Sequence, residues 1–519
     1  MKKTRMNSKY FAVILSTGLV LGLTACSEKT TESKTTDTTV TEAAEKLSDE
    51  SSANTAINNN TATDAENNSS SDIITNETIE NSADGEHAIT ADGEVAEYSN
   101  VKVIKSGEAD GDEADFYGEN AAIFATNGAT LDLSDMEIET NGTHANGVFS
   151  YGEGTTVNIS NATINTSGNC SGGLMATGGG TMNAENLTIH TTGNSSAAIR
   201  SDRGGGTVNV TGGNYTTDGT GSPVIYSTAD ITVYNATMES TASQGIVVEG
   251  KNSVTLNNVD LTANNNTKNS DKSDYYQAVM IYQSMSGDAA EGTASFAMND
   301  STLTNKNGEI FFINNTVAEI SLSNNVINNE DSEGVFLRAA AAGWGSEGSN
   351  GGNVTLNADN QKIDGNIIVD SVSTLNLYLE NSSSLNGAIN SESEGGEVYV
   401  ELSEGATWTL TENSYISSLT CDEDSINLNG HKLYVNGEEY KEGSASTGEA
   451  VEAKVSEGGQ GMQAPPDGDM PDGEPPSGEK PDGEPPAKPD GNPPSGEKPD
   501  GNPPAKPGEE STTESSTEE

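Results

Sequence analysis

The stretch LDLSDMEI at residues 131–138 alternates apolar and polar residues on both sides of a Ser-Asp pair. Alternation with a period of two is typical of a β-strand that buries one face, and the polar pair favours a bend between two such strands. The unit recurs at intervals of 26, 25, 26, 23 and 23 residues between positions 131 and 254. Its copies start at Leu131, Val157, Met182, Val208, Ile231 and Val254, and again at Phe296 and Ile320.

A further short apolar segment, such as GVF at 147–149 or GLM at 173–175, lies between successive copies. Three short strands with Gly-rich corners therefore repeat about every 24 residues. A helix would need a period of 3.6 residues and would not tolerate so much Gly and Asn. A coil of this kind buries its apolar side chains only against its neighbours in a stack. The repeat predicts an all-β protein, a single right-handed parallel β-helix.

Two neighbouring positions are both apolar in many of these segments. Because neighbours in a pleated strand point to opposite faces, we expect only one of the two to face the core. The other should form an apolar stripe on the outer face, which is either covered by another segment or part of a binding face. The pairs are Val148 and Phe149, Leu174 and Met175, Val224 and Ile225, Val335 and Phe336, and Ile367 and Ile368.

The repeated region resembles the right-handed parallel β-helix proteins of bacterial surfaces, a superfamily that includes pectate lyases and many adhesins. The resemblance covers about 350 residues, including DEADFYGEN (112–120), AAIRSDRGGGTVNV (197–210) and SPVIYSTADITV (222–233). These stretches look like uncharacterised surface proteins of anaerobic monoderm bacteria. The resemblance implies a fold and a surface location, and it brings no established activity.

The first 25 residues combine a basic start with the apolar run FAVILSTGLVLGL, which is typical of a secretion signal. The run ends in Leu23-Thr24-Ala25-Cys26, which resembles the lipobox of bacterial lipoproteins. In that family the signal is cut before the cysteine, which then carries a lipid. The resemblance implies that Cys26 is lipidated and holds the protein on the extracellular face of the bacterial cell membrane.

Both ends of the mature chain have compositions that cannot form a core. Residues 26–85 are rich in Ser, Thr, Asn and acidic residues, and we expect a disordered stalk there. Fifteen of the 16 prolines lie between Pro465 and Pro507, within a repeated Pro/Gly-rich sequence. We therefore expect residues 86–445 to form the β-helix and residues 446–519 to be a disordered acidic tail.

The formal net charge is −56, and only 32% of the residues are hydrophobic. Such a charge repels phosphate, so nucleic acid is excluded as a partner. The membrane, reached through the lipid, and an extracellular polysaccharide or host glycan are the partners that we expect. The leading interpretation is adhesion or carbohydrate binding. A polysaccharide lyase or glycosidase on the same scaffold is the alternative, and a structural surface protein without a ligand is the third.

Two insertions interrupt the regular spacing and supply the candidate ligand-binding residues. The interval from Val254 to Phe296 is 42 residues, and that from Ile320 to Val354 is 34. Residues 283–292 and 339–352 should leave the same corner two coils apart and lie side by side. Loops on a rigid scaffold commonly carry function, and flat aromatic rings suit the apolar faces of sugars. The candidates are Tyr275, Tyr276, Tyr282, Arg338 and Trp344.

Two polar clusters are further candidates. Arg200, Asp202 and Arg203 precede three glycines, and we interpret them as a brace of an exposed corner, with carboxylate recognition or catalysis as alternatives. No catalytic motif supports the enzymatic alternative. The segment 108–120 contains several carboxylates. Carboxylate oxygens at this density favour Ca²⁺, which is the only candidate cofactor. A solvated acidic cap is the other interpretation. The candidate metal ligands are Asp110, Asp112, Asp115 and Glu119.

Overall fold

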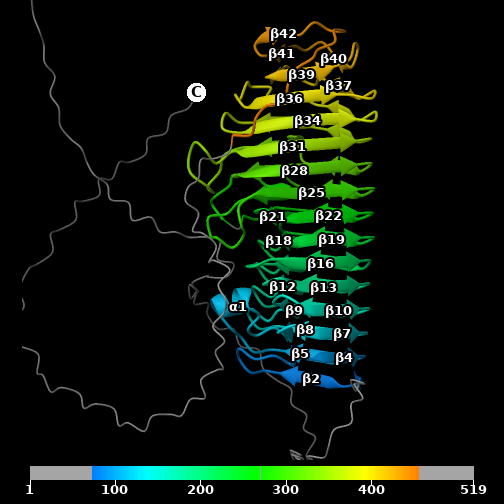
Figure 1. Ribbon diagram of the computed structural model, residues 1–519, viewed down its shortest axis with the longest axis vertical. Helices are drawn as coiled ribbons and strands as arrows, with labels where there is room; N and C mark the ends of the chain where they lie inside the picture. The colour runs from blue at the N-terminus through cyan, green and yellow to red at the C-terminus, as the bar shows by residue number, and fades with distance from the viewer. Residues whose placement is uncertain (1–72, 269, 455–519) are drawn as a thin grey trace, which may run out of the picture. The chain divides into compact units, whose positions relative to one another are not determined.

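The computed structural model describes residues 73–268 and 270–454, and these residues form a parallel β-helix (Figure 1). The signal segment, Cys26, most of the predicted stalk and the Pro-rich tail lie outside the described residues. Each coil up to the one that contains β28 and β29 contributes one strand to each of three parallel sheets, which we name A, B and C. The predicted all-β fold, a single parallel β-helix, is confirmed.

Sheet A has 14 strands in the described residues. They are β1 (Ile74–Thr75), β4 (Val95–Ser99), β7 (Thr130–Ser134), β10 (Thr156–Ser160), β13 (Gly180–Glu185), β16 (Gly206–Thr211), β19 (Asp230–Tyr234), β22 (Ser253–Asn257), β25 (Thr293–Asn299), β28 (Thr316–Ser323), β31 (Gly352–Asp359), β34 (Thr374–Glu380), β36 (Glu397–Leu402) and β39 (Ser418–Cys421).

Sheets B and C form the other two faces of the coils. Sheet B consists of β2 (Thr78–Asn81), β5 (Lys102–Lys105), β8 (Glu137–Thr140), β11 (Thr163–Thr166), β14 (Thr188–Thr191), β17 (Asn214–Thr217), β20 (Thr237–Ser240), β23 (Asp260–Ala263), β26 (Thr302–Asn305) and β29 (Val326–Asn329). Sheet C consists of β3 (Ile89–Asp92), β6 (Ile123–Thr126), β9 (Val148–Tyr151), β12 (Leu174–Thr177), β15 (Ile199–Ser201), β18 (Ile225–Ser227), β21 (Ile246–Glu249), β24 (Gln277–Tyr282), β27 (Glu309–Asn314), β30 (Val335–Ala339) and β33 (Asn366–Val369).

Two smaller sheets complete the C-terminal coils. The first consists of β32 (Lys362–Asp364), β35 (Ser384–Asn386), β37 (Thr407–Thr409) and β40 (Ile426–Asn427), and the second of β38 (Ser414–Ile416), β41 (Leu433–Val435) and β42 (Glu438–Glu439). The pair β41–β42 is antiparallel, unlike the pairs of sheets A, B and C. It lies at the C-terminal end of the stack, as Figure 1 shows. A hairpin there ends the parallel ladder.

The alternating repeat places one column of apolar side chains inside sheet A. Each first residue of the repeat pairs with its counterpart in the next coil, as Val157 does with Leu131 and Met182. The whole column is buried. The period of the sequence therefore set the register, because a shift by one residue would turn every apolar side chain outward. The column consists of Leu131, Val157, Met182, Val208, Ile231, Val254, Phe296 and Ile320.

The corner between sheets A and B is formed by the second residue of the polar pair. Asp135, Asn161, Asn186, Asn235 and Asn258 all have φ between 52° and 56°. Asn and Asp tolerate this left-handed conformation better than other residues with side chains. The amide side chains also form hydrogen bonds between coils, as Asn258 Nδ2 does with Asn235 Oδ1 at 2.8 Å. The predicted bend is confirmed.

The corner between sheets B and C contains a stack of glycines. A Cβ on Gly168 would lie 1.9 Å from the carbonyl oxygen of Gly142, and Gly193 has the same relation to Gly168. Gly219 continues the stack at 1.8 Å from the Gly193 oxygen. A side chain at these positions would therefore separate neighbouring coils.

We expect Gly168→Ala to destabilise the protein by about 3 kcal/mol or more, because its methyl group overlaps backbone that the strand ladder holds in place. Urea unfolding of the purified protein measures this change. Thr163→Ala, at an exposed position of the same coil, is the control and should stay within about 0.5 kcal/mol of wild type. Equal stability of both variants would contradict the tight stacking.

The described β-helix extends beyond the predicted boundaries. Its first coil begins with β1 at Ile74, within the residues that the sequence analysis assigns to the stalk. After the last coil, residues 446–454 return along sheet A. Val451 N donates to Asn376 Oδ1 at 2.9 Å, and Lys454 N donates to Asn353 Oδ1 at 2.7 Å. In return, Asn376 Nδ2 donates to the carbonyl oxygen of Val451, and Asn353 Nδ2 donates to that of Lys454. These residues are therefore part of the folded region.

The apolar stripe on the outer face of sheet C is present and is covered. Val148 and Leu174 face the core, whereas Phe149 and Met175 belong to a separate buried cluster on the other face. The prediction is wrong for Val224 and Ile225, which both face the core, because β18 begins only at Ile225. The outward column consists of Phe124, Phe149, Met175, Arg200, Tyr226, Val247, Met280, Phe312, Arg338 and Ile368.

One short helix, α1 (Asp112–Phe116), covers the N-terminal part of this stripe (Figure 1). Phe116 is buried, and its carbonyl oxygen accepts a hydrogen bond from Thr177 Oγ1 at 2.8 Å. The Tyr117 ring packs edge-on against Tyr151, with ring centroids 5.8 Å apart. No helix in the described part of the chain is long and apolar enough to span a membrane.

Candidate functional site

The two insertions meet on the outer face of sheet C, as predicted. Residues 283–292 follow β24 and residues 340–351 follow β30, at the same corner and two coils apart. They touch where Gly345 N donates to Met285 Sδ at 3.1 Å. A third segment, which we call segment 264–276 and of which residue 269 is not described, joins them, since Gly343 N donates to Lys272 O at 2.7 Å. The three segments cover the C-terminal half of the stripe.

The predicted aromatic residues come together where these segments meet sheet C, and two of them are buried. The rings of Tyr282 and Trp344 pack edge-on with centroids 5.2 Å apart, and the two residues are only 1% and 3% exposed. Tyr275 is half-buried and lies 5.4 Å from the ring of Phe312. Tyr282 and Trp344 therefore pack against each other on the outer face of sheet C, and each is almost fully buried.

Arg338 lies at the edge of this cluster and is already paired. Its Nε donates to Glu309 Oε1, and its guanidinium lies 4.2 Å from the centre of the Tyr275 ring. Burial raises the pKa of Glu309 to about 7, and the neighbouring Arg338 opposes the shift. The pair holds β27 and β30 to the overlying segment.

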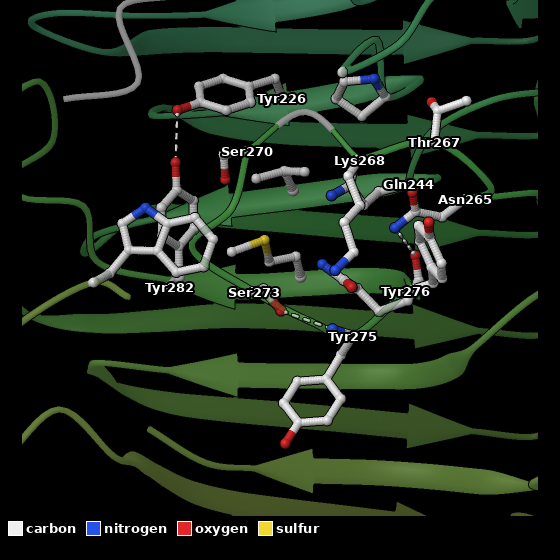
Figure 2. A pocket seen from close by; sticks show the side chains of 16 residues that line it. Tyr226, Gln244, Asn265, Thr267, Lys268, Ser270, Ser273, Tyr275, Tyr276 and Tyr282 are labelled. Carbon is white, nitrogen blue, oxygen red and sulfur yellow. Dashed lines mark hydrogen bonds between the residues drawn. The ribbon is translucent and has the colours of Figure 1, made fainter. Parts of the chain in front are cut away.

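A pocket opens between segment 264–276 and sheet C (Figure 2). Its volume is about 80 Å³, and Tyr275 and Tyr276 line it as the sequence analysis anticipates for a ligand site. Figure 2 shows Tyr226 and Tyr282 on one side, with their hydroxyl groups pointing toward each other, and amide side chains on the opposite side. The lining also includes Tyr226, Gln244, Asn265, Lys268, Gln277, Tyr282 and Trp344.

A buried carboxyl group fixes the two tyrosines. Glu249 Oε2 accepts hydrogen bonds from Tyr226 Oη and, at 3.0 Å, from Tyr282 Oη. The two hydroxyl oxygens are 3.2 Å apart. Burial raises the pKa of Glu249 and of both tyrosines. The rings are thus held in one orientation at one wall of the pocket.

Sequence reasoning missed Tyr226 and Gln277. Tyr226 stands in the outward column directly after Arg200, so the alternation of its strand could have placed it on the outer face. Gln277 opens β24 and is buried, with its Oε1 lacking a hydrogen-bond partner in the described structure. Trp344 Nε1 is also buried without a partner. Both residues line the pocket, and both of these atoms are buried.

Arg200 and Asp202 form the predicted brace, but it is buried. Arg200 Nη2 donates to Asp202 Oδ2 at 2.7 Å, and both side chains are 5% exposed. The expectation of an exposed corner was wrong because Arg200 takes the outward position of β15, which α1 and its neighbours cover. A ligand cannot reach this pair without displacing the covering segment.

Arg203 connects two of the covering segments. Its Nε donates to Asp288 Oδ1 at 2.6 Å, and its Nη1 donates to Asp112 Oδ2 at 3.1 Å. Its guanidinium also lies 3.7 Å from the centre of the Phe116 ring. Arg203 therefore links α1 to residues 283–292, and its positive charge is paired with two carboxylates of the protein.

The four predicted metal ligands do not converge. Asp110, Asp112 and Glu119 are exposed, and Asp112 pairs with Arg203, whereas Asp115 points into the protein. In the described residues, one group of potential ligands does converge, namely Asp115, His144 and Cys170. Cys170 is already engaged in an interaction of its own. We assign no metal site to either set.

Comparisons with protein-family models, curated proteins and solved structures find no significant match to this chain.

Proposed function

We propose that this protein is a lipid-anchored surface protein that binds carbohydrate in the pocket under segment 264–276. The observation that carries the proposal is the composition of the pocket wall, in which tyrosines face amide side chains. Tyrosine rings pack against the apolar faces of sugars, and amides exchange hydrogen bonds with their hydroxyl groups. The wall is part of a continuous parallel sheet, so these groups are held before a ligand arrives.

The pocket supports binding better than hydrolysis. Most glycosidases need two carboxyl groups on either side of the scissile bond, about 5–10 Å apart. No acidic residue lines this pocket in the described structure. Glu249 lies behind the two tyrosines and is committed to their hydroxyl groups. The lining thus favours carbohydrate binding over the glycosidase alternative.

Tyr276→Ala tests the site. Tyr276 is partly exposed and lines the pocket, so its loss should weaken glycan binding by about tenfold with little effect on folding. The measurement is a glycan array followed by titration of the best ligand with the full mature chain. Tyr234→Ala is the matched control, because Tyr234 is an exposed tyrosine on sheet A. If both variants bind as wild type, or if no glycan binds, the proposal is wrong.

The anchor is a separate proposal that rests on the resemblance of residues 23–26 to a lipobox. We expect Cys26→Ala to abolish incorporation of a fatty-acid label and to release the protein from the membrane fraction into the medium. Metabolic labelling and cell fractionation measure the two effects. Retention of the unlabelled variant on the membrane would show that another segment holds it.

A further inference from the structure

We infer that the outer face of sheet A across β31, β34, β36 and β39 is a docking surface for an extended peptide. Residues 447–454, which we call the strap, occupy this surface and thereby block it. The four strands are neighbours in sheet A, and the strap contacts all of them. The surface is separate from the carbohydrate pocket, which lies on sheet C.

Sheet A holds the strap mainly through the main chain of the strap. Asn376 Oδ1 accepts a hydrogen bond from Val451 N at 2.9 Å, and Asn376 Nδ2 donates to Val451 O at 3.0 Å. Asn353 forms the same pair of bonds with Lys454, at 2.7 and 3.2 Å. Hydrogen bonds to the main chain give affinity for any extended segment, whatever its side chains, and pockets for single side chains add specificity.

Two positions of the strap limit which segments fit. A Cβ on Gly448 would lie 2.3 Å from Ser418 Oγ and 2.8 Å from the next main-chain nitrogen, so larger residues are excluded there. Lys454 Nζ donates to Ser371 O at 3.0 Å and lies 3.2 Å from Glu397 Oε1. The surface therefore fits an extended peptide with a glycine at the position of residue 448 and a cation at that of residue 454.

The surface keeps its shape without the strap. Thr374 Oγ1 donates to Asn353 Oδ1 at 3.1 Å, and both residues are buried, so the amide group of Asn353 is held in one orientation. The two strands that carry Asn353 and Asn376 are paired along seven residues of the parallel ladder. A surface that is formed in advance binds a segment at a smaller cost in ordering entropy.

The strap can leave the surface without breaking a strand. Ser446 and Cys421 exchange two main-chain hydrogen bonds of 3.0 Å, so the chain up to Ser446 belongs to the last coil. Beyond it, Thr447, Glu449 and Ala450 are exposed, and the strap adds no strand to sheet A. A competing peptide therefore has to displace only the hydrogen bonds of the strap itself.

Gly448→Val tests the surface, because valine cannot enter beside Ser418 and the strap is expelled while sheet A stays intact. The purified protein is titrated with a fluorescent peptide of residues 447–454. We expect the variant to bind this peptide about tenfold more tightly than wild type, in which the strap competes at an effective concentration in about the millimolar range. Ala450→Val, at an exposed position of the strap, is the matched control and should bind like wild type.

A second peptide separates recognition of the main chain from packing of one particular sequence. It keeps the residues of positions 448, 451 and 454 and has Ala or Ser at the others. We expect its affinity for the Gly448→Val variant to lie within about threefold of the strap peptide. Adding Asn376→Leu to this variant should weaken both peptides about tenfold, because two hydrogen bonds are lost. Asn209→Leu, at an exposed position of β16, is the matched control.

Hydrogen exchange of the amides of Val451 and Lys454 reports the strap, and exchange in β31 reports the fold. In wild type we expect the strap amides to be protected, and in Gly448→Val they should exchange freely while β31 stays protected. Lys454→Glu, which places a carboxylate beside Glu397, is a second variant that releases the strap should Gly448→Val unfold. A released strap without peptide binding, or failure of the Ala/Ser peptide to bind, would overturn the inference.

Discussion

Trp344→Ala is expected to lower the free energy of unfolding by about 3–5 kcal/mol, because the indole is almost fully buried against Tyr282 and its neighbours on the outer face of sheet C. Removal of the ring leaves a cavity beneath residues 340–351 and exposes the apolar stripe that they cover. Urea or thermal unfolding of the purified protein measures the loss. The sequence alone favoured the opposite result, in which Trp344 is an open binding surface and its removal leaves the melting temperature nearly unchanged.

Tyr276→Ala is the matched control for this prediction, since Tyr276 lines the same pocket but is partly exposed. It should change the free energy of unfolding by less than about 1 kcal/mol. A Trp344→Ala variant as stable as Tyr276→Ala would mean that the indole does not pack as described. In that case residues 340–351 would not be a fixed cover of the sheet.

Relative to wild type, the Asp115→Asn variant is expected to gain about 4 kcal/mol in free energy of unfolding between about pH 4 and about pH 7. Burial raises the pKa of Asp115 from 3.8 to about 7, with the nearby Arg200 opposing the shift. The folded state therefore holds this proton more tightly than the unfolded chain does. The stability from the neutral carboxyl is complete below about pH 4 and is lost as the pH rises to about 7, at about 1.4 kcal/mol for each pH unit.

The wild-type protein partly conceals this effect. His144 Nδ1 lies 3.2 Å from Asp115 Oδ1, and burial, with the charge of Arg200, lowers the pKa of His144 to about 4. The unfolded chain protonates this histidine below about pH 6.5, so His144 adds stability as the pH rises from about 4 to about 6.5. The two slopes oppose each other over that range. The stability difference between variant and wild type removes the slope that the two proteins share and reports Asp115 together with its contact to His144.

Urea unfolding of both proteins between about pH 4 and about pH 8 gives this difference. Asp115→Asn should gain stability over wild type as the pH rises, because a neutral amide replaces a carboxylate that is buried beside Asp202 and Arg200. Glu113→Gln, at an exposed position of the same helix, should show no such trend. A difference that does not change with pH would contradict the burial of Asp115.

Local periodicity determined the fold from the sequence. The register of sheet A follows from the alternation around residues such as Val157, because the core accepts only one face of each strand. The corner after it follows from Asn161, because few residues other than glycine adopt its positive φ readily. Neighbouring coils repeat the same contacts, so one coil predicts the next. The meeting of residues 283–292 and 340–351 also followed, since coil spacing fixes where loops emerge.

The exposure of the outward side chains was decided by the tertiary structure. Arg200 and Tyr282 stand on the outer face that the alternation assigns, yet both are buried beneath segments from other coils, and Trp344 is buried because its own segment folds back onto that face. Whether a loop folds back over the sheet depends on long-range contacts that no repeat encodes, such as those of Arg203 with Asp112 and Asp288, which lie 91 and 85 residues away. The pocket results from the same folding back. The sequence therefore determined the scaffold, and packing between distant segments determined which side chains a ligand can reach.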